Sequence, residues 1–219
     1  MRSQLSIYLL LSLVLAFGCK PKPKTQKPLT KGEAIALFDG QNFKGWEGNK
    51  DFFRIEDQAI VGGNLEEAIP HNQFLCTEAS FGDFELRLKV KFWPDNNNGG
   101  VQIRSQRIPN HHEVIGYQVD VGYAGDEKVW ASIYDESRRN RFVARAPAEA
   151  VDRLLRAAEY NDYRIRCEGT RLQVWFNGEQ VIDYTEMEPD IAQMGKICVQ
   201  IHAGPPSEAW YKDIVLEAL

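Results

Sequence analysis

The stretch Asp83-Phe-Glu-Leu-Arg-Leu-Lys-Val-Lys-Phe92 decides the fold class, because apolar and charged residues alternate along it without interruption. Successive side chains of a β-strand point to opposite faces, so this period of two predicts a strand with one face in a core and the other in solvent. The expected core face carries Phe84, Leu86, Leu88, Val90 and Phe92.

The same alternation recurs around a hairpin signal further along the chain. Residues 163–167 and 172–176 alternate in the same way, and Asn177-Gly178 follows directly. An Asn-Gly pair between alternating segments is typical of a type I′ turn, so a return strand is expected over residues 180–184.

Turn and helix signals divide the rest of the chain. Glycine-containing clusters at Gly62-Gly63-Asn64 and at residues 96–100 indicate turns, the second of which opens a strand over residues 101–105. Residues 148–158 are the only segment typical of a helix, with Pro147 suited to its first turn. Many alternating strands with one short helix, and no internal repeat, predict an all-β sandwich of two antiparallel sheets.

The N-terminal segment predicts export. Its apolar run from Leu5 to Phe17 follows a basic residue and is too short to span a bilayer as a helix. We therefore expect a signal peptide over residues 1–18, then a lipidated Cys19 and a Lys- and Pro-rich tether over residues 19–32, and one sandwich domain over residues 33–219. The expected product is a membrane-anchored bacterial lipoprotein of the periplasm or cell surface. An ordinary cleaved export signal stays open as the alternative.

The charge balance restricts the partners. Six of the 26 basic residues and none of the 31 acidic residues lie in the first 31 positions, which leaves the remainder with a net charge of −11. Such a domain repels nucleic acid, whereas neutral sugars are compatible with it. Contact with a membrane is expected through the lipid anchor alone.

Cysteine and histidine spacing gives no metal motif. Cys76, Cys167 and Cys198 allow at most one disulfide among themselves in an oxidising compartment. The adjacent His111 and His112 would diverge in a strand, so they are interpreted as part of an exposed loop. No cofactor is therefore expected, and Ca²⁺ or another divalent metal stays open as an alternative.

Four motifs in order carry a resemblance to a known family: LFDG…GW in residues 37–46, GDFELRLKVKF in 82–92, NNGGVQIRSQ in 97–106 and HAGPPSEAWYKDI in 202–214. Together they resemble the 3-keto-disaccharide hydrolase family over residues 34 to 219. The resemblance implies a concanavalin A-like jelly-roll sandwich, of the kind found in lectins and glucanases, that acts on carbohydrate.

The resemblance also implies that a groove lies on the outward face of one sheet. Side chains predicted to share that face by strand parity are the candidate substrate-binding residues: Gln102, Arg104, Gln118, Tyr134 and Arg138, with Trp130, Trp175 and Trp210 as aromatic surfaces for stacking and Glu208 beside the last of them. For each of them the alternative is ordinary core packing or solvation.

Asp120 and Glu136 are the candidate general bases, and His202, in the closing motif, is the candidate acid. The Glu-x-Asp-x-x-Glu signature of glucanases with this fold is absent, because Gln118 stands two residues before Asp120. A glycosidase with two carboxylates is therefore disfavoured.

The substrate that the resemblance implies offers another route. A ketone at C3 of a sugar acidifies the proton at C2, so a base removes that proton, the C1 substituent leaves, and water then adds. Arg104 is the expected donor to the enolate oxygen. A non-catalytic, lectin-like glycan-binding module is the competing function, since a fold does not fix a function.

Overall fold

The computed structural model describes residues 29–219. The expected signal peptide, the lipidated Cys19 and most of the expected tether lie outside these residues. Within residues 29–219, no helix has the length and hydropathy required to cross a membrane.

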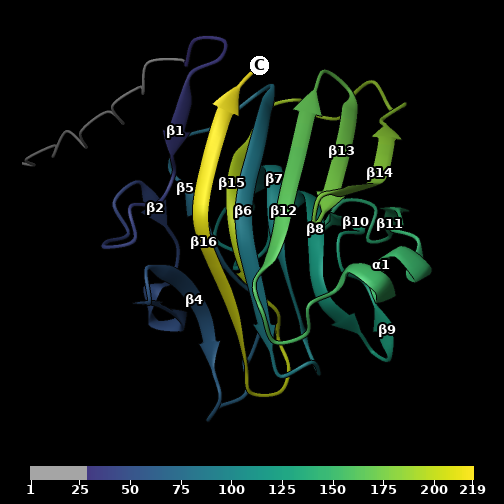
Figure 1. Ribbon diagram of the computed structural model, residues 1–219. Coiled ribbons are helices and arrows are strands. Elements are labelled where there is room, and N and C mark those ends of the chain that lie inside the picture. The colour runs from purple at the N-terminus through teal and green to yellow at the C-terminus, as the bar shows by residue number, and fades with distance from the viewer. Residues whose placement is uncertain (1–28) are drawn as a thin grey trace, which may run out of the picture.

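Two antiparallel sheets of eight strands each make up the structure (Figure 1). Sheet A has the order β14-β13-β12-β6-β16-β4-β3, with β1 beside β16: β1 (Ala34–Ala36), β3 (Phe53–Glu56), β4 (Ala59–Asn64), β6 (Phe84–Trp93), β12 (Asn161–Glu168), β13 (Arg171–Phe176), β14 (Glu179–Thr185) and β16 (Ser207–Ala218). Sheet B has the order β11-β10-β8-β7-β15-β5-β2, with β9 beside β8: β2 (Trp46–Glu47), β5 (Gln73–Thr77), β7 (Asn98–Arg107), β8 (Val114–Ala124), β9 (Glu127–Lys128), β10 (Ile133–Glu136), β11 (Phe142–Ala144) and β15 (Lys196–Ile201).

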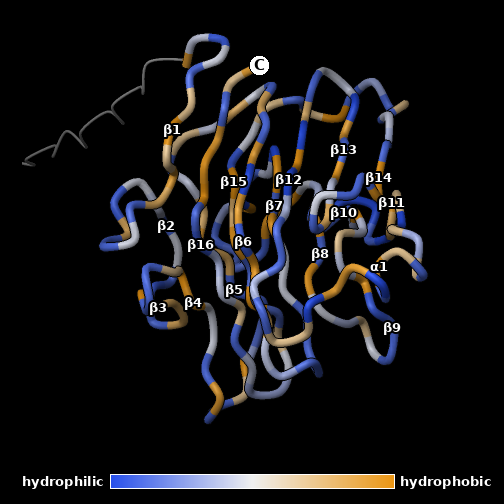
Figure 2. The backbone as a smooth tube through the Cα atoms, viewed as in Figure 1, coloured by the Kyte–Doolittle hydropathy of each residue, from blue (hydrophilic) through white to orange (hydrophobic). Residues whose placement is uncertain are grey.

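The core lies between the two sheets and is built by the alternation seen in the sequence. In β6 the alternating apolar residues from Phe84 to Phe92 are buried at 3% exposure or less, and they pack against inward positions of β7, β8 and β15. Hydrophobic segments recur along the strands of both sheets (Figure 2). The expected all-β sandwich of two antiparallel sheets is therefore confirmed.

Two short helices are present among the described residues: α1 (Ala148–Leu154) and the single 3-10 turn η1 (Lys50–Phe52). The expected helix is confirmed but shorter than the sequence pattern, because Leu155 adopts an extended conformation at φ −61° and ψ 126°. Pro147 stands at the N-cap, just before the first turn.

The prediction of a turn at residues 62–64 was wrong. Gly62 and Gly63 lie inside β4, and the chain needs glycine there for close packing. A Cβ atom on Gly62 would lie 2.9 Å from the Phe53 ring and 3.1 Å from Ile201 Cβ. The glycines thus let this strand approach the opposite sheet.

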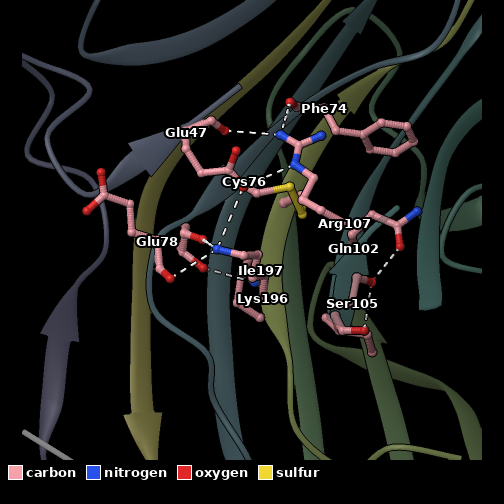
Figure 3. The surroundings of a disulfide bond; sticks show 12 residues. Glu47, Phe74, Cys76, Glu78, Gln102, Ser105, Arg107, Lys196 and Ile197 are labelled. Atoms are coloured by element: carbon pink, nitrogen blue, oxygen red, sulfur yellow. Dashed lines mark hydrogen bonds and ion pairs between the residues drawn. A yellow bond between two sulfur atoms is a disulfide. The ribbon is translucent and has the colours of Figure 1, made fainter. Parts of the chain in front are cut away.

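One disulfide joins Cys76 of β5 to Cys198 of β15, which are directly opposite each other in sheet B (Figure 3). Cys167 is the third described cysteine and is free and buried in the core. The bond therefore links two neighbouring strands that are 122 residues apart in the sequence.

Candidate functional site

The strand register of sheet B aligns polar side chains on its outer face, the face turned away from sheet A. One cross-strand row reads Cys76, Cys198, Gln102, Gln118 and Tyr134 across β5, β15, β7, β8 and β10. The next row reads Phe74, Gln200, Gly100 and Asp120. The amides of Gln102, Gln118 and Gln200 and the carboxylate of Asp120 therefore become neighbours although they come from three strands.

A pocket of about 390 Å³ is formed beside these rows. It is lined by Asn72, Asn96, Asn97, Asn98, Gln118, Asp120, Tyr123, Ala124, Gly125, Tyr134, Glu136, Phe142, His202 and Ala203. The three candidate catalytic residues, Asp120, Glu136 and His202, thus line the same pocket, together with two candidate substrate-binding residues, Gln118 and Tyr134.

Gln118 is held in place beside Asp120. Its Nε2 donates to Asp120 Oδ1 at 2.6 Å, and its Oε1 accepts a hydrogen bond from Gln102 Nε2 at 2.7 Å. The glycine at position 100 makes room for it, since a Cβ there would lie 2.4 Å from Gln118 Cδ. The second carboxyl oxygen of Asp120, Oδ2, therefore forms no hydrogen bond with this amide.

Asp120 is buried at 3% exposure. Burial raises the pKa of this carboxyl well above its usual range, the Gln118 hydrogen bond opposes the shift, and the charge of Glu136 adds to it. The protonated form of Asp120 is thereby favoured.

The pKa of Glu136 is raised by burial and by a different neighbour. Burial and then the nearby charge of Glu113 raise the pKa of Glu136 to about 7. Glu113 is fixed on the neighbouring loop by Asn72, whose Nδ2 donates to Glu113 Oε1 at 3.1 Å. A carboxyl with a pKa near neutrality is suited to both take and give a proton.

His202 directly follows β15, and its backbone N–H donates to the carbonyl of Asn98 at 3.0 Å. Its Nδ1 lies 2.7 Å from the carbonyl oxygen of Ala203. A carbonyl oxygen only accepts, so Nδ1 carries the hydrogen and proton exchange is left to Nε2.

Gln102 does not line the pocket. It is fully buried beneath it, and its Oε1 accepts a hydrogen bond from Ser105 Oγ at 2.7 Å while its amide donates to Gln118. The expectation of direct ligand contact is corrected to a supporting role for Gln118.

Arg104 also does not reach the pocket. A bulge between Ile103 and Gln106, with Arg104 at φ 49°, breaks the strict alternation that the sequence suggested. Its guanidinium, 1% exposed, instead donates to the Gly82 and Gly169 carbonyls, Gln193 Oε1 and Asp83 Oδ1. The predicted ligand contact is therefore wrong, and Arg104 joins three loops.

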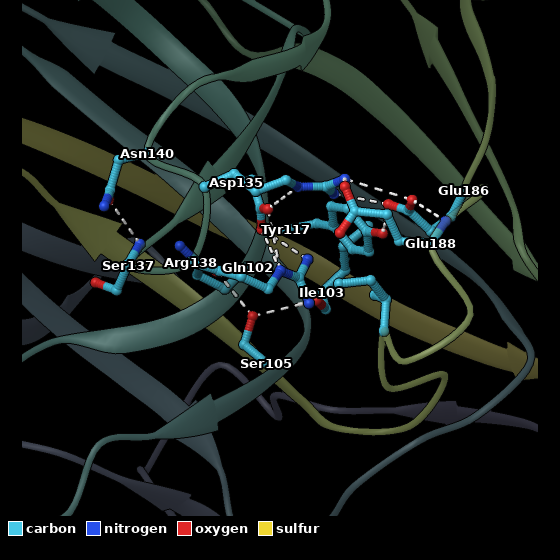
Figure 4. Close-up of polar contacts among 12 residues, drawn as sticks. Gln102, Ile103, Ser105, Tyr117, Asp135, Ser137, Arg138, Asn140, Glu186 and Glu188 are labelled. Atoms are coloured by element: carbon cyan, nitrogen blue, oxygen red, sulfur yellow. Dashed lines mark hydrogen bonds and ion pairs between the residues drawn. The ribbon is translucent and has the colours of Figure 1, made fainter.

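Arg138 belongs to a network at the edge between the sheets rather than to the pocket (Figure 4). It lies 4.6 Å from the Tyr117 ring centroid and is paired at 2.6 Å with Asp135, a fully buried carboxylate on the opposite side of β10 from Glu136. Arg139 links the same carboxylate to Glu186. The short turn after β10 bends Arg138 back onto this network.

The candidate aromatic surfaces lie elsewhere. Trp130 is 2% exposed and packs in the core with its ring centroid 6.0 Å from that of Phe176, so stacking on a ligand is ruled out for it in this conformation. Trp175, Glu208 and Trp210 belong to sheet A and face away from sheet B. The chain crosses between sheets after His202, so strand parity on β16 says nothing about that residue's neighbours.

Several pocket residues had no usable signal in the sequence. Asn72 and Tyr123 sit at strand ends, and Phe142 packs edge-on against Tyr134 with ring centroids 5.2 Å apart. In the sequence, Glu113 directly follows His111 and His112, which were interpreted as part of an exposed loop. Across residues 29–219, no group of three or more His, Cys, Asp and Glu side chains is arranged to hold a metal ion.

A comparison with known protein families shows the family of this chain. Residues 33–217 match the family model described as the 3-keto-alpha-glucoside-1,2-lyase-like domain. The chain belongs to this family. A comparison with curated proteins gave no match.

Solved structures share the fold of this 3-keto-alpha-glucoside-1,2-lyase-like domain. A predicted glycosyl hydrolase from Parabacteroides distasonis has a TM-score of 0.66 at 18% identity, covering 85% of this chain and 94% of that chain. The carbohydrate-binding module CBM66 from Bacillus subtilis has a TM-score of 0.61 at 14% identity, with 80% and 96% covered. A Bacillus subtilis protein with a galectin-like fold has a TM-score of 0.62 at 11% identity, with 86% and 97% covered.

Proposed function

We propose that the protein cleaves 3-keto-glycosides in the pocket on the outer face of sheet B. The observation that carries this proposal is that Asp120, Glu136 and His202 line one pocket and that the pKa of Glu136 is raised to about 7. Family membership supports a carbohydrate substrate.

The proposed reaction is an elimination. Glu136 takes the proton from C2, and the electron pair of that C–H bond moves into an enolate whose negative charge lies on the C3 oxygen. The enolate then re-forms the ketone while the C1–O bond breaks, giving a C1–C2 double bond, and the leaving oxygen takes a proton from His202. Water adds to C1 in the second stage and gives one proton to Nε2 of His202, and Glu136 returns the proton to C2, so both residues regain their starting states.

Asp120 takes the role for which Arg104 was expected. A carboxyl kept protonated by burial donates a hydrogen bond, and a donor aimed at the developing enolate oxygen lowers the barrier. The amide of Gln118 occupies Oδ1, which leaves Oδ2 to carry that proton toward the substrate.

His202 is assigned as the acid at the leaving oxygen. Its Nδ1–H···O=C bond to Ala203 persists in both protonation states, so the ring keeps its orientation while Nε2 gives up its proton.

The test is aglycone release from a synthetic 3-keto-glucoside, with the unoxidised glucoside as control. We expect Glu136→Gln and His202→Ala to lower kcat by about 10²- to 10⁴-fold. Asp120→Asn retains a donor and should keep much more activity than Asp120→Leu, which loses about 10²- to 10³-fold. Equal loss in both Asp120 variants would contradict the donor role, and turnover of the unoxidised glucoside at the same rate would contradict the elimination route.

A non-catalytic glycan-binding function is the second candidate. The similarity of fold to CBM66 favours it, and the same pocket would hold the glycan. Sugar binding without turnover of any keto-glycoside, and unchanged in Glu136→Gln, would support this function in place of catalysis.

We further propose export and anchoring through a lipidated Cys19, as the N-terminal sequence predicts. Metabolic labelling with a radioactive fatty acid should mark the wild-type protein and not Cys19→Ala. Equal labelling of both would contradict anchoring at this residue.

A further inference from the structure

A second pocket, of about 410 Å³, lies on the outer face of sheet A, the opposite face of the molecule from the proposed catalytic pocket. Its polar and aromatic lining consists mainly of Arg87, Lys89, Asp162, Arg164, Trp175 and Asp213. None of these residues contributes to the chemistry described above.

The strand register builds the centre of this pocket. Arg87 of β6, Arg164 of β12 and Trp175 of β13 are directly opposite one another in three adjacent strands. The Arg164 guanidinium consequently lies over the Trp175 ring, with Cζ 3.6 Å from the centroid. Stacking fixes the guanidinium plane and leaves its edge donors free to meet a ligand.

Most charges in the pocket are already compensated by a neighbour. Lys89 pairs with Asp162 at 2.5 Å, and Arg87 pairs with Glu85 on the same strand. These pairs leave little net charge for a ligand to neutralise.

Two opposite charges in this pocket have no side-chain partner among residues 29–219. Neither Arg164 nor Asp213 forms a hydrogen bond or ion pair through its side chain with any residue from 29 to 219, and Arg164 Nε is buried without a partner. Asp213 lies in the β16 bulge at φ 53°, which turns it out of the regular alternation and into the pocket lining. One free set of donors and one free set of acceptors thus face the same space.

These features match the surface of an uncharged sugar. A pyranose ring offers an apolar C–H face to the flat surface of the stacked Arg164–Trp175 pair, and its adjacent hydroxyls both accept from a guanidinium and donate to a carboxylate. Because the free charges of Arg164 and Asp213 cancel, a charged ligand would gain no net compensation. A pocket of this volume lies within the range that small-ligand sites occupy.

We propose that the outer face of sheet A holds a second, non-catalytic carbohydrate site, formed by Trp175, Arg164 and Asp213, that takes a neutral sugar unit. Its position on the opposite face allows it to hold a glycan while the pocket of sheet B stays free. The two sites are therefore expected to bind independently.

The experiment is isothermal titration calorimetry of the full protein with cellohexaose, maltohexaose and xylohexaose, and with hexagalacturonate as the charged probe. Trp175→Ala and Arg164→Gln should weaken binding of at least one neutral probe by tenfold or more. The matched controls are Trp93→Ala, an exposed Trp of sheet A outside the pocket, and Arg166→Gln, on the same face of the same strand but paired with Glu168. Both should bind as the wild type does.

Asp213→Asn provides a second variant that leaves the stacked pair intact, and thermal unfolding of each variant checks its fold. Loss of binding in Tyr134→Ala with retention in Trp175→Ala would overturn the proposal, as would the absence of binding to every neutral probe. Tighter binding of hexagalacturonate than of the neutral hexamers would also overturn it, because the site would then be selecting charge.

Discussion

At the residue scale, the site depends on carboxyl groups whose neighbours set their protonation. Strand parity places Gln118 on the same face as Asp120 and Tyr134 on the same face as Glu136, and all four line the pocket. It gave no information on their pKa values, because these follow from burial and from Glu113, which lies on a loop outside the alternating pattern.

Glu136 should make the protein less stable at alkaline pH. Its folded pKa of about 7 lies above the ordinary value of 4.5, so its stabilising contribution is complete below about pH 4.5 and is lost as the pH rises through 7. We expect Glu136→Gln to raise the free energy of unfolding by about 2 kcal/mol at pH 8, less than the full shift implies because the carboxyl is partly exposed. At pH 4 the variant and the wild type should match. Urea unfolding at both values measures this, and an equal gain at both would contradict the assigned pKa.

Glu113 should control the pH at which Glu136 becomes ionised. Glu113→Gln removes a negative charge that raises the pKa of Glu136, so that pKa falls toward 4.5. The acidic limb of the kcat/KM profile with a 3-keto-glucoside is expected to move to lower pH by about half a unit or more. Glu66→Gln, on an exposed turn, serves as the control. An unmoved acidic limb in Glu113→Gln would show that Glu136 is not the group observed.

At the element scale, the predicted strands and hairpin were found where the alternation was strict. Predictions from the sequence were wrong where the backbone departs from this regular alternation. Arg104 illustrates this, because its β-bulge turns the side chain toward loop carbonyls that lie near it only in the folded chain. The turn predicted at Gly62 was wrong for a different reason: glycine is required there by close packing between the sheets.

Gly100 tests how far one strand position supports the site. A Cβ atom there would overlap Gln118, which is 2% exposed and has no free space to move into. We expect Gly100→Ala to cost about 1 to 3 kcal/mol of stability and to lower kcat strongly, because Gln118 can no longer hold Asp120. Gly82→Ala is the control, since its added Cβ would make only an ordinary contact at 3.7 Å. Unchanged kcat in a folded Gly100→Ala protein would separate the Gln118 amide from catalysis.

At the scale of the whole molecule, neighbouring strands come from distant parts of the chain. In sheet B, β15 lies between β7 and β5, so residues near the C-terminus complete a sheet begun near the N-terminus. Three cysteines allow three pairings, and the sequence does not choose among them. The register does, because it brings Cys76 and Cys198 directly opposite each other and leaves Cys167 in the core between the sheets.

This long-range link should contribute substantially to stability. A crosslink that closes a loop of 122 residues restricts the unfolded chain by about 5 kcal/mol in the chain-entropy model. The double variant Cys76→Ala/Cys198→Ala is therefore expected to unfold at a clearly lower urea concentration than the oxidised wild type. Cys167→Ala, which removes an equally buried sulfur without a crosslink, measures the packing cost alone. If the double variant loses no more than twice the free energy of unfolding that Cys167→Ala loses, packing explains the whole loss. The crosslink itself then adds no stability.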